Sequence, residues 1–316
     1  MPLWLSESDV QSSLPMDDLI GAMDQALAGF SGGSVVQPVR MAFEYRPASY
    51  FGLMPAYDPV SELTGAKLLT FIPGNIAKGL ATHQALIVLF HPESGELLAV
   101  ADGRYITEAR TAAVSAVSTR YLAKAEASVL AILGSGVQAH SHLAAIPLVR
   151  DLREIRVWSP TRARLERFVS GAGPRVRAAA SAEEAARGAD IVVLATASTT
   201  PVIEEAWIAP GTHVIAVGAC RPNHHEVPPA LMRRALLVVD SHAAAVVESG
   251  DVILSGTQDH IHAELGEIAA GRKPGRERAD QVTLFKSLGL AIEDIVSAGL
   301  AYRRALQSGR GAQVAL

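Results

Sequence analysis

The feature that most constrains this sequence is a glycine-containing turn placed directly after an apolar run. Apolar residues fill 129–133, the turn Gly134-Ser-Gly136-Val-Gln-Ala139 follows, and helical spacing begins there. In a G-x-G-x-x-A turn the first glycine permits a tight bend, the second lets the backbone approach a pyrophosphate, and the alanine lets helix and strand pack closely. The helix N-terminus then offers free N–H groups to phosphates. The residues expected at a dinucleotide cofactor are therefore Gly134, Gly136, Val137, Gln138 and Ala139.

The sequence around this turn alternates between short apolar runs and helical patterns. The runs expected to be strands are 128–134, 154–159, 176–180, 190–196, 212–218 and 236–241. Strands that alternate with helices are typical of βαβ units and a parallel sheet. We therefore expect an α/β protein in which residues 123–289 form a Rossmann doubly wound sheet that binds NAD(P).

The residues before this sheet follow a different pattern. A helix is expected over 19–30 and another over 104–123. Between them, turn residues separate five β-type runs at 35–45, 50–57, 65–72, 85–90 and 96–101. A last helical pattern over 283–307 is expected to pack back on this small sheet, which needs cover. The predicted second domain is thus a smaller α+β domain made from both chain ends, 1–122 together with 290–316.

Composition narrows the class of protein. The 316 residues carry 28 Lys+Arg against 32 Asp+Glu, a formal charge of −4, so nucleic acid is not an expected partner. One cysteine, Cys220, excludes an intrachain disulfide and fits a reducing compartment. The N-terminal residues lack the basic and apolar regions of a signal peptide, and the apolar runs are far below the roughly 18 residues that span a bilayer. A cytoplasmic protein without a membrane segment is expected.

The end of the second parallel strand bears on the choice of cofactor. NAD-specific sites carry Asp or Glu there to bind the ribose hydroxyls, whereas this chain has Ser159, followed by Thr161 and Arg162. These side chains can bind a 2′-phosphate, so NADP(H) is favoured and NAD(H) stays open. Arg162 as an exposed arginine at a helix start is the alternative. Thr196, after the fourth strand, is expected either at the cofactor or in the following turn.

Three cations stand among apolar or small residues near the N-terminal sheet: Arg40, Lys67 and Arg110. Burying a cation without an anion is costly, so each either reaches water or is paired. If they converge they can hold a carboxylate, for which arginine offers bidentate geometry. Next to a nucleotide-binding domain they predict an amino acid or keto acid substrate. Thr82 and His83 lie in a segment expected to line the same site.

The residues from Gly65 to Ala113, and further motifs across the chain, resemble the ornithine cyclodeaminase/μ-crystallin family. The motifs are Lys67, Pro73-x-Asn75, Lys78-Gly79, Thr82, Leu89-Phe90, Gly95, Ala101-Asp102, Ile106-Thr107, Arg110–Ala113, 134–140, Gly218…Pro222…Glu226, 239–241, 248–251, 285–289 and Asp294.

The resemblance implies a homodimer whose subunits each join a Rossmann domain to a substrate and dimerisation domain. It implies that Arg40, Lys67 and Arg110 bind the substrate carboxylate and the nitrogen-bearing carbon, with Lys67 a candidate catalytic proton donor. The cofactor contacts expected on the same grounds include Thr111, Val217, Ser287 and Gly289.

Two positions depart from the ornithine cyclodeaminase pattern. Gly52 and Cys220 stand where those enzymes carry acidic residues that handle the δ-amine and activate the nucleophile or water, which glycine and cysteine do not do in the same way. Glu44 either compensates or is an exposed strand residue. The departure argues against ornithine as substrate.

The histidine pairs at 140/142, 224/225 and 260/262 lack a carboxylate or cysteine at familiar ligand spacing, so no metal is expected. The sequence predicts reduction of a cyclic ketimine such as pyrroline- or piperideine-2-carboxylate, or of a keto acid with ammonia. An authentic ornithine cyclodeaminase and a non-catalytic NADPH- or small-ligand-binding protein remain the alternatives.

Overall fold

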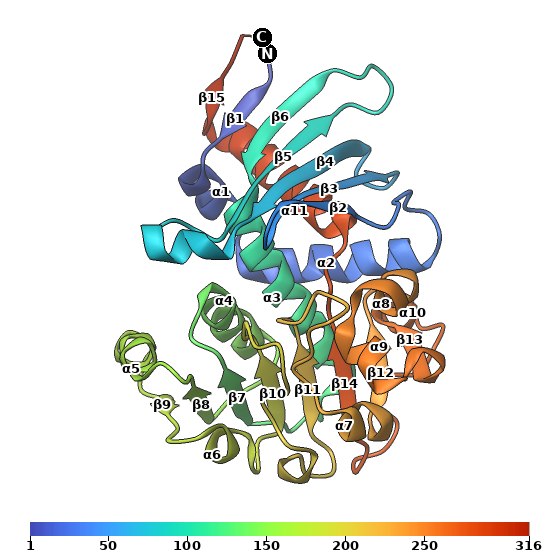
Figure 1. Cartoon of the computed structure of the whole chain (residues 1–316). Coiled ribbons are helices and arrows are strands. Elements are labelled where there is room, and N and C mark those ends of the chain that lie inside the picture. Colours follow the sequence, from blue (N-terminus) through green and yellow to red (C-terminus); the bar gives the residue numbers. More distant parts are fainter. Residues whose placement is uncertain (316) are drawn as a thin grey trace. The chain divides into compact units, whose positions relative to one another are not determined.

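The computed structural model describes residues 1–315, which fold into two compact units (Figure 1). Unit 1 contains Met1–Arg110 and the residues from Leu290 onward, and unit 2 contains Thr111–Gly289. The first boundary lies after Arg110 and not after 122, because helix α3 (Gly103–Leu122) is shared. Its first turns contact unit 1, where Thr107 accepts a hydrogen bond from Lys67, and its later turns bond to histidines of unit 2.

Unit 1 is built on a seven-stranded sheet in the order β15-β1-β6-β5-β4-β3-β2. The strands are β1 (Leu3–Leu5), β2 (Met41–Arg46), β3 (Ser49–Asp58), β4 (Leu63–Phe71), β5 (His83–Phe90), β6 (Leu97–Asp102) and β15 (Ala312–Gln313). Neighbours pair antiparallel except β1 and β6, which are parallel, so the sheet is mixed. The five expected strands are present, but β2 begins at Met41 and not at 35, and the sequence missed β1 and β15.

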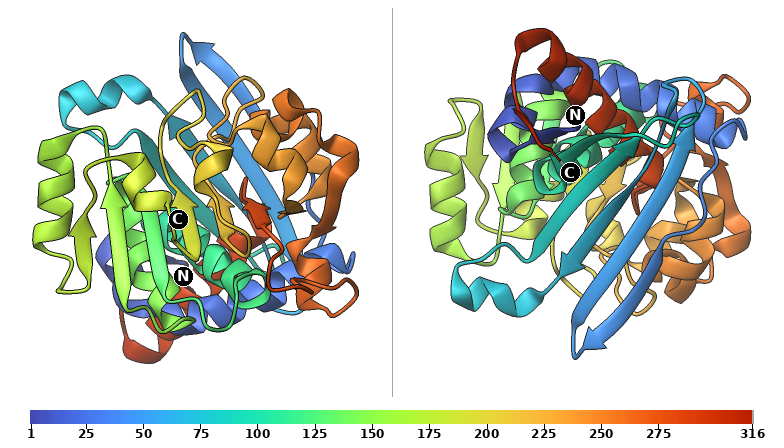
Figure 2. Two further views of the ribbon diagram at one scale, coloured as in Figure 1. Left: turned by 90° about the horizontal axis from the view of Figure 1, so that it is seen from below. Right: turned by 90° about the horizontal axis from the view of Figure 1, so that it is seen from above.

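Helices cover one face of this sheet. They are α1 (Glu7–Ser13), α2 (Met16–Ser31) and α11 (Ala291–Ser308), with a 3-10 turn at Pro73–Lys78. Helix α11 contacts β3, β4, β5 and α2, and Figure 2 (right) shows the strands lying over it. The face of β4 that meets α11 carries alternate buried residues, Leu63, Gly65 and Lys67. A side chain at Gly65 would collide with the carbonyl of Val88 in the neighbouring strand β5, at 2.1 Å, so glycine permits the close approach of β5.

Unit 2 is built on an eight-stranded parallel sheet in the order β13-β12-β14-β11-β10-β7-β8-β9, which Figure 1 shows across its width. The strands are β7 (Val129–Leu133), β8 (Glu154–Trp158), β9 (Val176–Ala178), β10 (Ile191–Leu194), β11 (His213–Ala216), β12 (Leu236–Val239), β13 (Ile261–Glu264) and β14 (Thr283–Lys286). All six expected strands are present. The α/β fold class, a doubly wound sheet with a smaller α+β unit, is confirmed.

One expected element is wrong in part. The helix predicted over 283–307 begins only at Ala291, and Thr283–Lys286 is the parallel strand β14 between β11 and β12. All four residues of β14 are buried. A short, fully buried strand has no period-2 alternation, so its apolar residues cannot be distinguished from the start of the following helix.

The helices of unit 2 are α4 (Val137–Ala145), α5 (Arg162–Ser170), α6 (Ala182–Ala186), α7 (Pro229–Arg234), α8 (His242–Glu248), α9 (Gly250–Ser255) and α10 (Leu265–Ala269), with 3-10 turns at Ile146–Leu148, Glu205–Trp207 and Gln258–His260. The strand order reverses between β7 and β10, which places a ligand crevice at the carboxyl ends of these strands. Within residues 1–315 no helix combines the length and apolar character needed to cross a lipid bilayer.

Candidate functional site

The glycine turn after β7 has the geometry that its sequence predicts. Gly134 has a φ of +130°, and a Cβ there would lie 2.3 Å from the carbonyl oxygen of Ala195, so no other residue fits. Gly136 is the N-cap residue of α4, and a Cβ added to it would meet open space. Val137 begins the helix half-exposed, and Ala139 is fully buried against the strand. The turn therefore presents exposed backbone to a ligand at a helix N-terminus.

The end of β8 is joined to this turn by a hydroxyl pair. Ser135 Oγ donates to Ser159 Oγ at 2.9 Å. Thr161 is the N-cap residue of α5, and Arg162 is 88% exposed and pairs with Glu166 at 2.8 Å. The end of β8 therefore places a hydroxyl beside the turn, while the Arg162 guanidinium faces solvent and pairs with Glu166.

A buried carboxylate holds the residues that follow β10 and β11. Glu226 Oε1 accepts from Thr196 N at 2.9 Å and Thr196 Oγ1 at 2.6 Å, while Oε2 accepts from Gly218 N at 2.6 Å. Val217 is buried, with its N–H bonded to Leu194 O. Burial raises the pKa of Glu226 to about 7 although Lys286 acts in the opposite direction. No role for Glu226 is predicted from the sequence, because nothing in its neighbours indicates a buried acid.

A second carboxylate fixes the loop after β14. Asp240 Oδ2 accepts from Leu288 N at 2.5 Å and Gly289 N at 2.6 Å, and Ser287 Oγ lies 3.4 Å away. Gly289 has a φ of +85°, in the left-handed region that favours glycine. Asp240 follows β12, so it positions Ser287 and Gly289 from the neighbouring strand. The sequence placed Asp240 in a motif but did not reveal this contact.

Unit 1 contains a group of four buried charges, which we call the α11 charge cluster: Lys67, Arg110, Glu293 and Asp294. Lys67 Nζ lies 2.6 Å from Asp294 Oδ2, and Arg110 Nε lies 3.2 Å from Oδ1 of the same carboxylate. Arg110 Nη1 lies 2.7 Å from Glu293 Oε2. Side-chain exposure is 5% or less in all four. Two of the three cations expected at the substrate, Lys67 and Arg110, are thus paired with helix α11.

The surroundings change the titration of these groups. Burial lowers the pKa of Lys67 to about 8; Asp294 opposes that effect, and the positive charges of Arg110 and Arg40 add to it. Burial favours a raised pKa for Asp294, but Lys67 and Arg110 together hold it below its ordinary value. Burial, with Lys67, lowers the pKa of His83 to about 4. The cluster therefore contains an ionised Asp294 and a Lys67 whose pKa lies near neutrality, and the His83 imidazole beside it is neutral.

The other expected substrate residues lie around this cluster. Arg40 is partly buried in the segment before β2, and His83 is the first residue of β5 with Thr82 preceding it. Arg40 and His83 are both close enough to interact electrostatically with Lys67. Thr111 follows Arg110 in α3 and is buried at the start of unit 2.

The positions that depart from the cyclodeaminase pattern carry no carboxylate. Gly52 lies in β3 opposite Leu69, whose side chain fills the space that a Cβ would enter, at 3.1 Å. Cys220 is exposed, and its thiol donates to Val217 O at 3.5 Å. Glu44 lies on the exposed strand β2, where its carboxylate accepts from Ala48 N at 2.7 Å and so stabilises a turn. Glu44 therefore has a local structural role.

The histidine pairs do not converge on one another. His142 is buried between Ser115 Oγ, 2.8 Å from Nε2, and Gln138 O, 2.7 Å from Nδ1, whereas His140 stacks on Phe168. In the described part of the chain, 1–315, no group of three or more His, Cys, Asp or Glu side chains is arranged to hold a metal ion.

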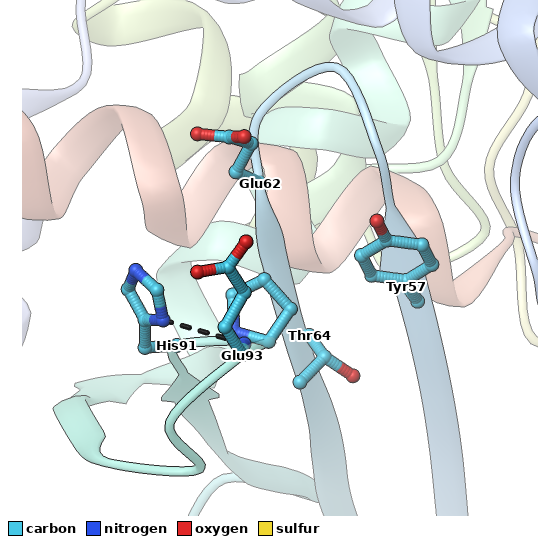
Figure 3. Close-up of a pocket in the computed structure, with 6 residues that line it drawn as sticks. Tyr57, Glu62, Thr64, His91 and Glu93 are labelled. Carbon is cyan, nitrogen blue, oxygen red and sulfur yellow. Dashed lines mark hydrogen bonds between the residues drawn. The ribbon is translucent and has the colours of Figure 1, made fainter.

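A separate pocket of about 410 Å³ lies at turns of unit 1 (Figure 3). It is lined by Tyr57, Glu62, Thr64, His91, Pro92 and Glu93. His91 Nδ1 accepts the N–H of Glu93, so the imidazole is used by its own turn. None of the expected site residues lines this pocket.

Comparison with known proteins identifies the chain's relatives. The model of the ornithine cyclodeaminase/mu-crystallin family matches residues 2–309. The chain belongs to this family. Ketimine reductase mu-crystallin of Rattus norvegicus is 44% identical over 306 residues, which cover 95% of this chain and 96% of that protein.

Solved structures agree with this assignment. The Delta(1)-pyrroline-2-carboxylate reductase of Thermococcus litoralis, in complex with NADH and L-proline, superposes with a TM-score of 0.96 at 37% identity and covers 99% of this chain and 100% of its own. An archaeal alanine dehydrogenase dimer with bound NAD superposes with a TM-score of 0.94 at 33% identity, covering 99% of both chains.

Proposed function

We propose that the protein is an NAD(P)-dependent oxidoreductase of this family that reduces the carbon–nitrogen double bond of a small cyclic imino acid, such as pyrroline- or piperideine-2-carboxylate. Reductive amination of a keto acid is the same chemistry on an imine formed from ammonia. The observation that supports the proposal is the α11 charge cluster, in which Lys67 and Arg110 are buried and paired with the carboxylates of helix α11.

The charges of the cluster favour an anionic ligand. Glu293 and Asp294 balance Lys67 and Arg110, and Arg40 adds a further positive charge near Lys67. A substrate carboxylate placed against Arg40 and Arg110 therefore neutralises the site, and guanidinium groups suit its planar geometry. Thr82 and His83 border the same group. These residues bind and orient the substrate, which accounts for much of the catalysis expected in such a site.

Lys67 is the catalytic proton donor in this proposal. With a pKa of about 8 it is mostly charged at neutral pH and yet releases a proton readily to an imine nitrogen. Asp294, 2.6 Å away, keeps the ammonium group in place while the proton moves. Once the nitrogen is protonated, the imine carbon accepts hydride more easily, and nicotinamide would supply that hydride when it is bound.

The nucleotide residues of unit 2 fit this cofactor. Gly134 and Gly136 leave the backbone bare at the start of α4, as a pyrophosphate requires. The other proposed contacts are Thr111, Val137, Gln138, Ala139, Ser159, Thr161, Arg162, Thr196, Val217, Ser287 and Gly289. Because Ser159 replaces the carboxylate that repels a 2′-phosphate, we favour NADP(H) over NAD(H).

The uncovered face and edge of the unit 1 sheet support a homodimer. Every residue of β2 is exposed, among them Met41 at 64%, Phe43 at 54% and Tyr45 at 44%. A contiguous set of exposed apolar side chains marks an interaction surface. The archaeal alanine dehydrogenase relative is a dimer, and a second copy of this chain is the expected partner.

The test is direct. Mixing the protein with NADPH and Δ1-pyrroline-2-carboxylate is expected to consume NADPH, followed by absorbance at 340 nm. Release of ammonia from ornithine in the presence of NAD would instead identify a cyclodeaminase, which the missing acids at Gly52 and Cys220 disfavour. Tight NADPH binding without turnover of any imine or keto acid would indicate a binding protein.

A further inference from the structure

The carboxylate of Glu226 joins two neighbouring strands of unit 2 at their carboxyl ends. It receives three hydrogen bonds of 2.6 to 2.9 Å, two from Thr196 after β10 and one from the N–H of Gly218 after β11. Its side chain is fully buried. All three donors lie in the segments that leave the sheet on the side where a dinucleotide binds.

Backbone contacts connect this carboxylate to the glycine turn. A Cβ at Gly218 would lie 2.2 Å from the Thr196 carbonyl oxygen and 2.5 Å from Glu226 Oε1, and a Cβ at Gly134 would lie 2.3 Å from the Ala195 carbonyl. The ends of β7, β10 and β11 therefore touch without intervening side chains. A shift of Thr196 moves its neighbour Ala195 and, through it, the phosphate-binding turn.

Glu226 is itself held from two further elements. Its backbone N–H donates to Asp251 Oδ1 at 2.8 Å, and Val227 N donates to the same oxygen at 3.0 Å. Asp251, in α9, pairs with Lys286 of β14 at 3.0 Å, and both side chains are wholly buried. Lys286 and Asp251 are the charged groups that act on Glu226, with opposite effects on its proton affinity. The backbone and the carboxylate of Glu226 are thus both held by buried hydrogen bonds.

Only the ionised form of Glu226 satisfies this arrangement. Each of its oxygens faces a backbone N–H, which needs an acceptor. A proton on either oxygen would face an N–H donor, and at least one of these buried hydrogen bonds would be lost. Protonation therefore loosens the link between Thr196 and Gly218.

We propose that Glu226 is a positioning residue for the dinucleotide, whose carboxylate holds the ends of β10 and β11, and through Ala195 the glycine turn, in the binding conformation, so that protonation of Glu226 weakens dinucleotide binding. The inference rests on the proposed cofactor. Since Glu226 has a pKa of about 7, its ionised fraction falls about tenfold from pH 8 to pH 6, and the Kd for NADH should rise about tenfold.

The experiment measures the Kd of NADH by nicotinamide fluorescence between pH 6 and pH 8 in the full chain and in Glu226→Gln. NADH has no phosphate that titrates in this range. The variant should bind about tenfold more weakly at pH 8 and lose the pH dependence, while kcat at saturating NADH stays close to that of the parent. Glu204→Gln, at an exposed position of the same unit, is the matched control and should keep the parent's profile.

A second variant and a second readout separate positioning from folding. Glu226→Asp keeps the charge and should retain the pH dependence. Without ligand, the raised pKa means that this group favours the folded state more as pH falls from 7 towards 4.5, so stability and NADH affinity should respond to this group in opposite directions.

The inference is overturned if Glu226→Gln follows the parent's Kd profile, or if Glu226→Asp, folded by circular dichroism, shows no pH dependence. Failure of the parent to bind NADH or NADPH at pH 8 would instead overturn the proposed function.

Discussion

Each unit buries charged side chains, but the two groups are assembled from different partners. In the α11 charge cluster of unit 1, two carboxylates face two cationic side chains, Lys67 and Arg110. In unit 2, Lys286 pairs with Asp251, whose other oxygen accepts two backbone N–H groups, and both oxygens of Glu226 also accept backbone N–H groups. In the proposed function, the first group keeps its cations balanced until a substrate carboxylate binds; the second group uses its acids to fix the backbone. The burial of a charged side chain is therefore not by itself evidence of a catalytic role.

The largest effect that would test this contrast is on turnover. Lys67→Met should lower kcat by about a hundredfold or more, because the proton donor is lost while Asp294 keeps its bond to Arg110. Fluorescence titration should show nearly unchanged NADPH affinity. Lys273→Met, at a partly exposed lysine of unit 2, is the control. Substantial turnover by the Lys67 variant would show that Lys67 is not the proton donor.

The corresponding change in unit 2 should act on stability. Lys286→Met leaves Asp251 as a buried charge without its counter-ion, so the free energy of unfolding should fall by about 3–5 kcal/mol in denaturant titrations. Turnover at saturating cofactor should fall far less than in Lys67→Met. Equal losses of turnover in the two variants would contradict the assignment of a catalytic role to the α11 charge cluster and a structural role to the Lys286–Asp251 pair.

Acid should destabilise unit 2 through its two fully buried histidines. Burial lowers the pKa of His142 to about 4 and that of His213 to about 3. Since both values lie below the ordinary 6.5, stability is complete above pH 6.5 and falls as the pH drops towards 4, by about 3 kcal/mol for each histidine.

Unfolding by urea at pH 7 and pH 4.5 measures this loss. In the variant His142→Gln the loss between the two pH values should shrink. An unchanged loss would assign the acid sensitivity to carboxyl groups instead.

The smallest expected effect concerns cofactor choice. Arg162→Ala removes an exposed guanidinium, so the Kd for NADPH should rise about fivefold, or about 1 kcal/mol, with little change for NADH. Parallel titrations with the two nucleotides would show it. Equal changes would support the interpretation of Arg162 as an ordinary surface arginine paired with Glu166.

Much of unit 2 could be predicted because its signals are local. The glycine turn and its strand adjoin in sequence, and six strands were expected where they occur. Strands β13 and β14 were not expected, and β14 was missed because four buried residues next to a helix show no period of their own. Strands β1 and β15 pair three and two residues at the sheet edge and have no sequence pattern to mark them.

The candidate site likewise contains residues that the sequence predicts and residues that it does not. Lys67 and Arg110 stood out because a cation is costly to bury, which is a property of the residue itself. Their partners Glu293 and Asp294 lie 183 and 184 residues beyond Arg110, and no local pattern connects them. Glu226 and Asp240 bind backbone groups of other strands, so their roles emerge only when the sheet is assembled.

The order of the chain has a consequence for synthesis. Unit 2 is one continuous stretch, Thr111–Gly289, whereas unit 1 needs α11, which follows it. Domains generally fold as units while the ribosome is still adding residues. On a nascent chain that has reached Gly289, the nucleotide sheet has all its strands, yet Lys67 and Arg110 still lack Glu293 and Asp294. The unit that we propose to bind substrate is thus the last to be completed, and a chain truncated at Gly289 would contain the parallel sheet without the complete charge cluster.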